Sequence, residues 1–223
     1  MKNVEFKLLK KFAELEGAEL ILLLVAVALA ATLFGAVYRY EKTKWAEKEN
    51  VKKKGTRPLV YGALSLTLSF ILSYFKLFSI SFGGSVTLCS MLPIMLYAYV
   101  FGPGYGFLTA LAYAVLQVVQ GAYIVHPVQF ILDYFVAFTC YGIPSLFPNQ
   151  LRLGIAAGGT ARLLASTVSG AVFFASAGLE AGFADPWAYS FVYNLLTIGI
   201  DTALTILAAA LLPVKRFETI MRS

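Results

Sequence analysis

The chain has 223 residues, of which 59% are hydrophobic and only 13% are charged, and its mean hydropathy is +0.76. A soluble domain usually carries about 25% charged residues, so this composition excludes an ordinary soluble domain and predicts a membrane protein. The formal net charge is +6. Because the basic residues gather beside apolar runs, this charge indicates a membrane topology rather than nucleic-acid binding.

Seven apolar runs approach the length of about 20 residues that a membrane-spanning helix needs. They cover residues 18–38, 58–75, 86–101, 104–120, 127–148, 154–177 and 187–212. A strongly basic stretch, residues 39–57, separates the first run from the others. We therefore expect residues 1–57 to form an appended N-terminal transmembrane helix with a basic cytoplasmic linker, and residues 58–223 to form a six-helix membrane core.

The placement of lysine and arginine predicts the orientation of these helices, because basic loops tend to stay in the cytoplasm. The linker 39–57 is the most basic segment and defines the inner side. Counting spans from there puts the turn 149–152 and the C-terminal tail on the same side. The connection 178–186, which has two acidic residues and no basic one, falls outside. We expect both termini of the core to be cytoplasmic.

The fifth run and the residues before it contain the single histidine and an isolated carboxylate. In the segment GAYIVHPVQFILDYFVAF, His126, Gln129 and Asp133 lie at positions i, i+3 and i+7, so a helix places them on one face. A carboxylate within an apolar membrane helix is costly and usually faces the bundle interior or a water-filled cavity. This face is therefore a candidate binding site.

The last run carries a polar stripe below an aromatic start. Its polar residues follow a helical spacing on one face; they are Ser190, Asn194, Thr197 and Asp201. Asn194 and Asp133 are expected at a similar depth, about 10 Å below the outer ends of their helices. Aromatic rings attract a cation, and a carboxylate accepts hydrogen bonds from an amino group. The pattern predicts a small outward-facing pocket for a flat organic cation.

The remaining residues with chemical potential are expected to be structural. Arg162 and Asp201 both fall near or below the middle of the membrane, so we expect them to form an ion pair within the bundle. Cys89 and Cys140 lie in apolar stretches and are expected to be small buried hydrophobic residues. The sequence has no P-loop, no HExxH or GxSxG motif and no Cys/His cluster. It therefore predicts no ATP hydrolysis, no enzyme activity, and no cofactor or metal.

Four segments carry a resemblance to a known family. They are GGSVTLCSMLPI (83–94), YIVHPVQFILDYFVAF (123–138), ARLLASTVSGAVFF (161–174) and YSFVYN (189–194). In this order and spacing, the chain resembles the thiamine-specific substrate-binding (S) components of energy-coupling factor (ECF) transporters. The resemblance covers most of residues 58–223. It implies an all-α membrane protein in the cell membrane of a prokaryote: a six-helix S-component bundle, here with one extra N-terminal transmembrane helix.

The resemblance also implies a vitamin site near the outer face and roles for individual residues. Asp133 matches the acidic ligand for the aminopyrimidine ring, and Tyr134 lies beside it. Tyr123 matches a tyrosine in the connection above the pocket. Phe174 matches an aromatic residue that stacks on the substrate.

The last helix and one departure from the family pattern complete the predicted site. Tyr189 and Asn194 match a pair near the thiazolium end of the ligand. The family motif reads R-x-x-x-H-x-x-S-G. In this chain the position of the histidine is occupied by a serine, Ser166. The predicted substrate-binding residues are Asp133, Tyr134, Tyr123, Phe174, Tyr189, Asn194, Ser166, His126 and Gln129.

The resemblance implies partners as well. Transport in this family requires two ABC-type ATPases and a transmembrane coupling protein, against which the S component docks through small residues of its first core helix. Small side chains let two helices approach closely. The small positions predicted for docking are Ala63, Thr67, Ser65 and Ser69.

The leading prediction is high-affinity binding and uptake of thiamine, or of a close analogue or precursor, as the substrate-specific subunit of an ECF-type transporter. One alternative is an S component for another vitamin or pyrimidine. Another is a stand-alone secondary transporter that uses Asp133 or Asp201 in proton coupling. An intramembrane enzyme would need His126 as its base, and the proline that follows His126 at the outer rim argues against this role.

Overall fold

The computed structural model describes residues 56–80 and 84–222. The predicted N-terminal transmembrane helix and almost all of the basic linker lie outside these residues. The division of the chain at residue 57 therefore stays a prediction.

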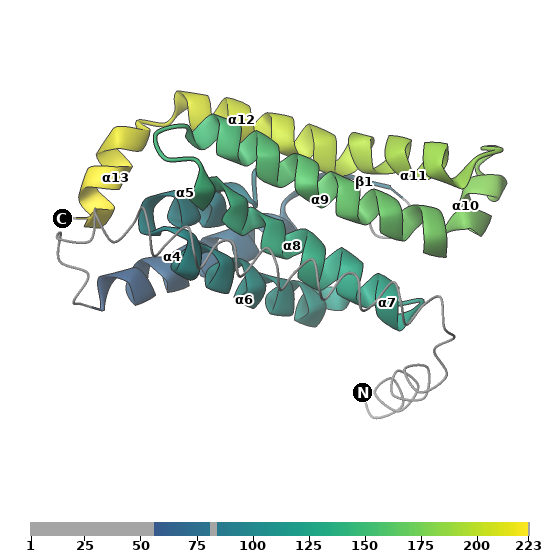
Figure 1. The fold of residues 1–223 in the computed structure, drawn as a ribbon, viewed down its shortest axis with the longest axis horizontal. Helices are drawn as coiled ribbons and strands as arrows, with labels where there is room; N and C mark the ends of the chain where they lie inside the picture. The colour runs from purple at the N-terminus through teal and green to yellow at the C-terminus, as the bar shows by residue number, and fades with distance from the viewer. Residues whose placement is uncertain (1–55, 81–83, 223) are drawn as a thin grey trace.

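The described chain is a bundle of helices with one small hairpin (Figure 1). The first half contains α4 (Arg57–Tyr74), β1 (Lys76–Ser79), β2 (Ser85–Thr87), α5 (Leu92–Phe101) and α6 (Pro103–Gly121). A broken helix follows, made of α7 (Pro127–Phe130), the π-helix η3 (Ile131–Val136), α8 (Ala137–Thr139) and the 3₁₀-helix η4 (Cys140–Leu146). The second half contains α9 (Leu151–Phe173), α10 (Ala175–Glu180), α11 (Pro186–Asn194), the π-helix η5 (Leu195–Gly199), α12 (Ile200–Leu211) and α13 (Val214–Arg222).

The prediction of an all-α membrane bundle is confirmed, and local sequence explains several helix boundaries. Pro58 lies in the first turn of α4, where its missing N–H costs no hydrogen bond. Gly102 alone joins α5 to α6 with φ of +88°, a conformation that suits glycine. Within the described residues, Pro186–Leu211 is the one continuous helix that is both long enough (26 residues) and apolar enough to cross a membrane by those criteria.

The third core segment differs from its prediction as a helix over residues 86–101. The helix begins only at Leu92, and residues before it form strand β2, which pairs antiparallel with β1. Val86 and Thr87 are β-branched and favour extended backbone, and Cys89 has φ of +55°, which breaks any continuous helix. The ten residues of α5 span about 15 Å, half of the roughly 30 Å of a bilayer's apolar core.

The C-terminal tail also forms a helix that the sequence analysis did not predict. Pro213 separates α12 from α13, because it cannot donate the next helical hydrogen bond. Its carbonyl accepts from the N–H groups of Arg216 and Phe217 and so starts α13. Helix α13 lies across the end of the bundle opposite α7 and α10 (Figure 1).

The core is centred on α5, which contributes Tyr97, and on tyrosines from α6 and η4. Tyr97, Tyr113 and Tyr141 are each almost completely buried. Helix α9 packs closely on α12 at Gly159, where a Cβ atom would lie 2.3 Å from the side chain of Thr202. This contact requires glycine at position 159. It fixes the distance between α9 and α12, which both contribute residues to the cavity described below.

We expect Gly159→Val to destabilise the bundle by about 1–3 kcal/mol, because the added side chain would overlap Thr202. Thermal unfolding of the purified protein in detergent measures this loss. Thr160→Val is the matched control, since Thr160 is exposed on the next position of the same helix. Equal melting temperatures for the two variants would contradict the close packing of α9 on α12.

Candidate ligand-binding site

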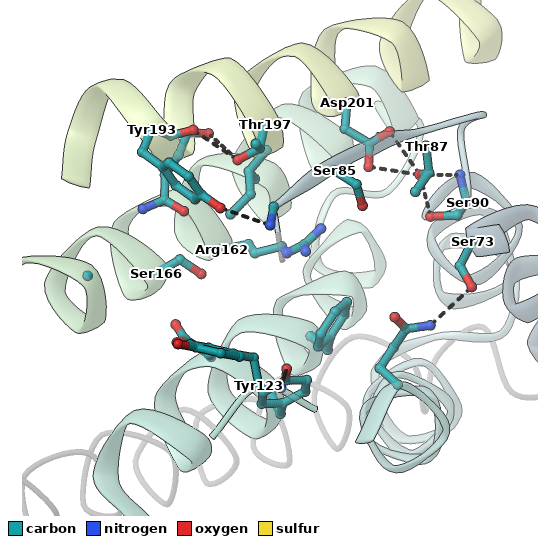
Figure 2. A pocket seen from close by; sticks show the side chains of 18 of the residues that line it. Ser73, Ser85, Thr87, Ser90, Tyr123, Arg162, Ser166, Tyr193, Thr197 and Asp201 are labelled. Carbon is teal, nitrogen blue, oxygen red and sulfur yellow. Dashed lines mark hydrogen bonds between the residues drawn. The ribbon is translucent and has the colours of Figure 1, made fainter. Parts of the chain in front are cut away.

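A cavity of about 280 Å³ lies between β2, α6, η3, α9 and the helix formed by α11, η5 and α12 (Figure 2). All but one of the predicted substrate-binding residues line it. These are Asp133, Tyr134, Tyr123, Phe174, Tyr189, Asn194, Ser166 and Gln129. Residues more than 70 positions apart in the sequence, such as Tyr123 and Asn194, therefore meet around one space.

His126 is the exception, and its predicted role is corrected. It does not line the cavity. Its backbone is extended just before Pro127, its Nδ1 accepts a hydrogen bond from the N–H of Val128 at 3.2 Å, and its ring stacks on Phe173 with centroids 4.8 Å apart. His126 is thus the N-cap of α7. The period-based prediction failed because the helix starts only after this residue.

Asp133 is held in place by Gln129, one helical turn earlier. The Nε2 of Gln129 donates to Oδ2 of Asp133 at 2.7 Å and to the carbonyl of Tyr123 at 3.2 Å, while its Oε1 accepts from the N–H of Val125 at 3.1 Å. Gln129 is only 2% exposed. It therefore links the connection above the cavity to the carboxylate inside it, and positions Asp133 as well as lining the space.

Aromatic rings surround the mouth of the cavity. Tyr123 and Phe174 stack with centroids 6.0 Å apart, and Tyr189 and Tyr193 lie at 5.9 Å. The hydroxyl of Tyr134 accepts a hydrogen bond from the N–H of Tyr123 at 2.8 Å. The faces of these aromatic rings offer favourable electrostatic contacts to a cationic ring of a ligand.

Asn194 occupies the opposite wall. Its amide group donates to the carbonyl of Ser190 at 2.9 Å, and the hydroxyl of Ser190 donates to the carbonyl of Thr167 at 2.8 Å. Helices α9 and α11 approach closely here, because a Cβ atom on Gly170 would lie 2.2 Å from Ser190 Oγ. The NH₂ group of Asn194 faces its own helix, so its side-chain carbonyl is the atom suited to accept a hydrogen bond from a ligand.

Two π-helical segments flank the cavity. Asp133 and Tyr134 lie in η3, and η5 begins directly after Asn194 and includes Thr197. Such segments are rare and often occur at functional sites. They widen the helix locally and so change which side chains face inward. We find no sequence signal that would have predicted them.

The hairpin supplies lining residues that the sequence analysis missed. Gly84, Ser85 and Thr87 line the cavity, as does Lys76. The N–H of Gly84 donates to the hydroxyl of Tyr193 at 2.8 Å and joins the hairpin to the last long helix. Because the sequence predicts a helix from residue 86, it does not predict that the hairpin contributes residues to the cavity lining.

The predicted ion pair between Arg162 and Asp201 is wrong. Arg162 instead donates to the hydroxyl of Tyr141, and its guanidinium lies over the ring of Phe138, 4.5 Å from the centroid. Asp201 accepts from the hydroxyl of Thr87 at 3.2 Å. Both charged side chains line the cavity. Depth alone suggested the pair, but the neighbouring rings and the hairpin offer each group another partner.

The predicted docking residues are divided between two faces of α4. Ala63 and Thr67 are exposed, whereas Ser65 and Ser69 are buried, with 8% and 0% exposure. The prediction is therefore corrected for the two serines, because a four-residue spacing places them on the face that packs inside the bundle.

Comparison with known proteins identifies the family. The model of the thiamine transporter protein family matches residues 59–221. The thiamine transporter ThiT of Bacillus subtilis (strain 168) is 33% identical over 129 residues, which cover 50% of this chain and 66% of that protein, just under two thirds of its length. The solved structure of ThiT from Listeria monocytogenes shares the fold, with a TM-score of 0.52 and 21% identity over 74% of this chain and 93% of that one.

The family predicted from the four sequence segments is thus confirmed by an independent match over most of the described chain. The same residues form the helical bundle and contain the entire cavity lining. The chain belongs to the thiamine transporter protein family.

Proposed function

We propose that this protein binds thiamine, or a close analogue, as the substrate-specific subunit of an ECF-type transporter. The observation that carries this proposal is the convergence of a carboxylate, an amide and several aromatic rings on one cavity, in a chain whose residues 59–221 match the thiamine transporter family. Sequence similarity to the B. subtilis thiamine transporter supports the same substrate class.

The chemistry of the cavity suits a cationic ligand with an amino-substituted ring. Asp133 offers a carboxylate to the amino group, and charge-assisted hydrogen bonds of this kind are the stronger ones. Aromatic faces add about 0.5–2 kcal/mol each to the binding of a cation, depending on desolvation. Typical ligand pockets have about 300–1,000 Å³, so a cavity of about 280 Å³ suits a small ligand of one or two rings.

The sequence contains no P-loop, so we do not expect this chain to hydrolyse ATP itself. We propose two ABC-type ATPases and a transmembrane coupling protein as partners. The exposed face of α4 is the proposed docking surface. Ala63 and Thr67 lie on it among exposed apolar residues, which are Leu59, Val60, Leu64, Leu68 and Ile71. Small residues flanked by leucines allow a partner helix to approach closely.

We also propose that the core crosses the membrane several times, with the α13 end of the bundle in the cytoplasm. Arg57, Arg152 and Lys215 are exposed at the helix ends on that side, whereas Glu180 and Asp185 are exposed near α10. Basic residues favour the cytoplasmic side. The cavity, whose mouth is formed by Tyr123 and Phe174, would then open outward.

We expect Asp133→Asn to weaken thiamine binding by about 2–5 kcal/mol, because a partly buried charged acceptor is lost while its shape is kept. Calorimetric titration of the purified protein measures the change, and its melting temperature reports on folding. Asp185→Asn removes the same charge from an exposed helix cap outside the cavity and serves as the control. A well-folded Asp133→Asn protein that binds like the wild type would remove this carboxylate from the site.

Ser166→His should strengthen thiamine binding by about 1 kcal/mol, the value of one added hydrogen bond. Ser166 lines the cavity where the family motif has histidine, so the longer side chain would reach the ligand. The same titration tests this, with Thr160→His on the exposed side of α9 as a control. Weaker or unchanged binding would indicate a cavity adapted to another ligand.

Cysteines placed at Arg152 and at Glu180 should react with a membrane-impermeant thiol reagent from opposite sides of the membrane. Both positions are exposed, and the experiment requires prior replacement of Cys89 and Cys140. Labelling of right-side-out and inside-out vesicles provides the measurement. Labelling of both cysteines from the same side would exclude the proposed topology.

A further inference from the structure

The inner end of the cavity is polar and is distinct from the walls that hold Asp133 and Asn194. Asp201 lies on the same helix as Asn194 but two turns, about 10 Å, further from the mouth. It is 3% exposed and lines the cavity together with Thr87, Ser90 and Arg162. We call these four residues the inner compartment. Figure 2 shows Asp201 opposite Thr87 and Ser90, which come from one segment, with Arg162 on another helix.

The carboxylate of Asp201 has unused capacity to accept hydrogen bonds. Among the described residues it accepts from Thr87 alone, whose hydroxyl lies 3.2 Å from both carboxylate oxygens and whose backbone N–H also donates to it. Thr87 Oγ1 also lies 2.7 Å from Ser90 Oγ and accepts from the N–H of Ser90 at 3.4 Å. Thr87 therefore directs its single proton to Asp201, whereas an ionised carboxylate has about four acceptor sites.

Arg162 has unused capacity to donate. One of its terminal nitrogens donates to Tyr141, and the rings of Phe138 and Tyr141 hold its guanidinium at 4.5 and 5.3 Å from their centroids. Its Nε is buried and has no hydrogen-bond partner among the residues that the structure describes. Arginine has five N–H donors in a fixed arrangement, so the remaining N–H groups of its two terminal nitrogens can serve a ligand.

The inner compartment therefore holds one positive and one negative charge that are not paired with each other. Its net charge is zero, with an acceptor on α12 and a donor on α9. A neutral group that both donates and accepts, such as an alcohol, matches this arrangement. A phosphate does not, because Asp201 would repel it and like charges held together cost several kcal/mol.

We propose that the inner compartment binds the hydroxyl end of the ligand and that Asp201 discriminates against its phosphate esters. This inference rests on the proposed function. In thiamine, the aminopyrimidine at one end suits Asp133, and the hydroxyethyl group at the other end carries the alcohol. Asp201 is thus a specificity-determining residue: it accepts from the alcohol and cancels the attraction of Arg162 for an anion.

The test compares the binding of thiamine and of thiamine monophosphate to the wild type and to Asp201→Asn. The wild type should prefer thiamine. In Asp201→Asn the Arg162 charge is uncompensated, so thiamine should bind more weakly and the monophosphate more tightly. The preference should fall by about tenfold or more, since a like-charge contact is relieved. Asp185→Asn, with the same charge change outside the cavity, should leave the preference unchanged.

The outcomes separate this inference from the proposed function. A wild type that binds no thiamine would overturn the proposed function itself. A wild type that binds thiamine, with an unchanged preference in folded Asp201→Asn, would overturn only the role of Asp201. If the melting temperature shows that Asp201→Asn does not fold, Arg162→Gln decides: the preference for thiamine over the monophosphate should then rise, and an unchanged preference would refute the proposal.

Discussion

The structure depends on one constraint: within a membrane, every backbone N–H and C=O group must be satisfied without water. Helices do this internally, so irregular backbone is tolerated only where it lines a cavity or is covered by protein. Much of the non-helical backbone in the described chain follows this rule, although strand β1 is exposed along its length. The hairpin strand β2 and the π-helices η3 and η5 all border the cavity. The regular helices supply the scaffold and part of the cavity lining, and the irregular segments supply further lining residues.

The two walls of the cavity are organised in the same way, each through a polar side chain that ties it to a neighbouring segment. Gln129 connects Asp133 to the backbone of residues 123–125. Tyr193 connects the last long helix to the hairpin at Gly84. Removing either link would change the positions of other ligand-facing groups, although Gln129 and Tyr193 also line the cavity themselves. Shape and charge in the cavity are therefore properties of the surrounding network as much as of the lining residues.

Hydropathy and helical period predicted the long helices and placed Asp133 and Asn194 around one space. These two signals give wrong predictions where a contact with a residue distant in the sequence determines the local structure or the hydrogen-bond partner. A short apolar run before Leu92 fits a strand or a helix equally well, and pairing with β1 settles it. The helical period places His126 on a helix face, whereas it caps the helix. Arg162 and Asp201 were paired by depth, but Tyr141 and Thr87 become their partners only in the folded bundle.

The shortness of α5 has a consequence for the distance that a transported molecule must travel. The cavity ends at Thr87 and Ser90, immediately before α5. From there α5 runs, shielded by its neighbours, towards the end of the bundle covered by α13, and its ten residues measure about 15 Å. The part of the bundle beyond the inner end of the cavity is thus about half as long as the apolar core of a bilayer is thick. Buried tyrosine and aliphatic side chains of α5, among them Tyr97, Ile94 and Met95, fill this part of the bundle.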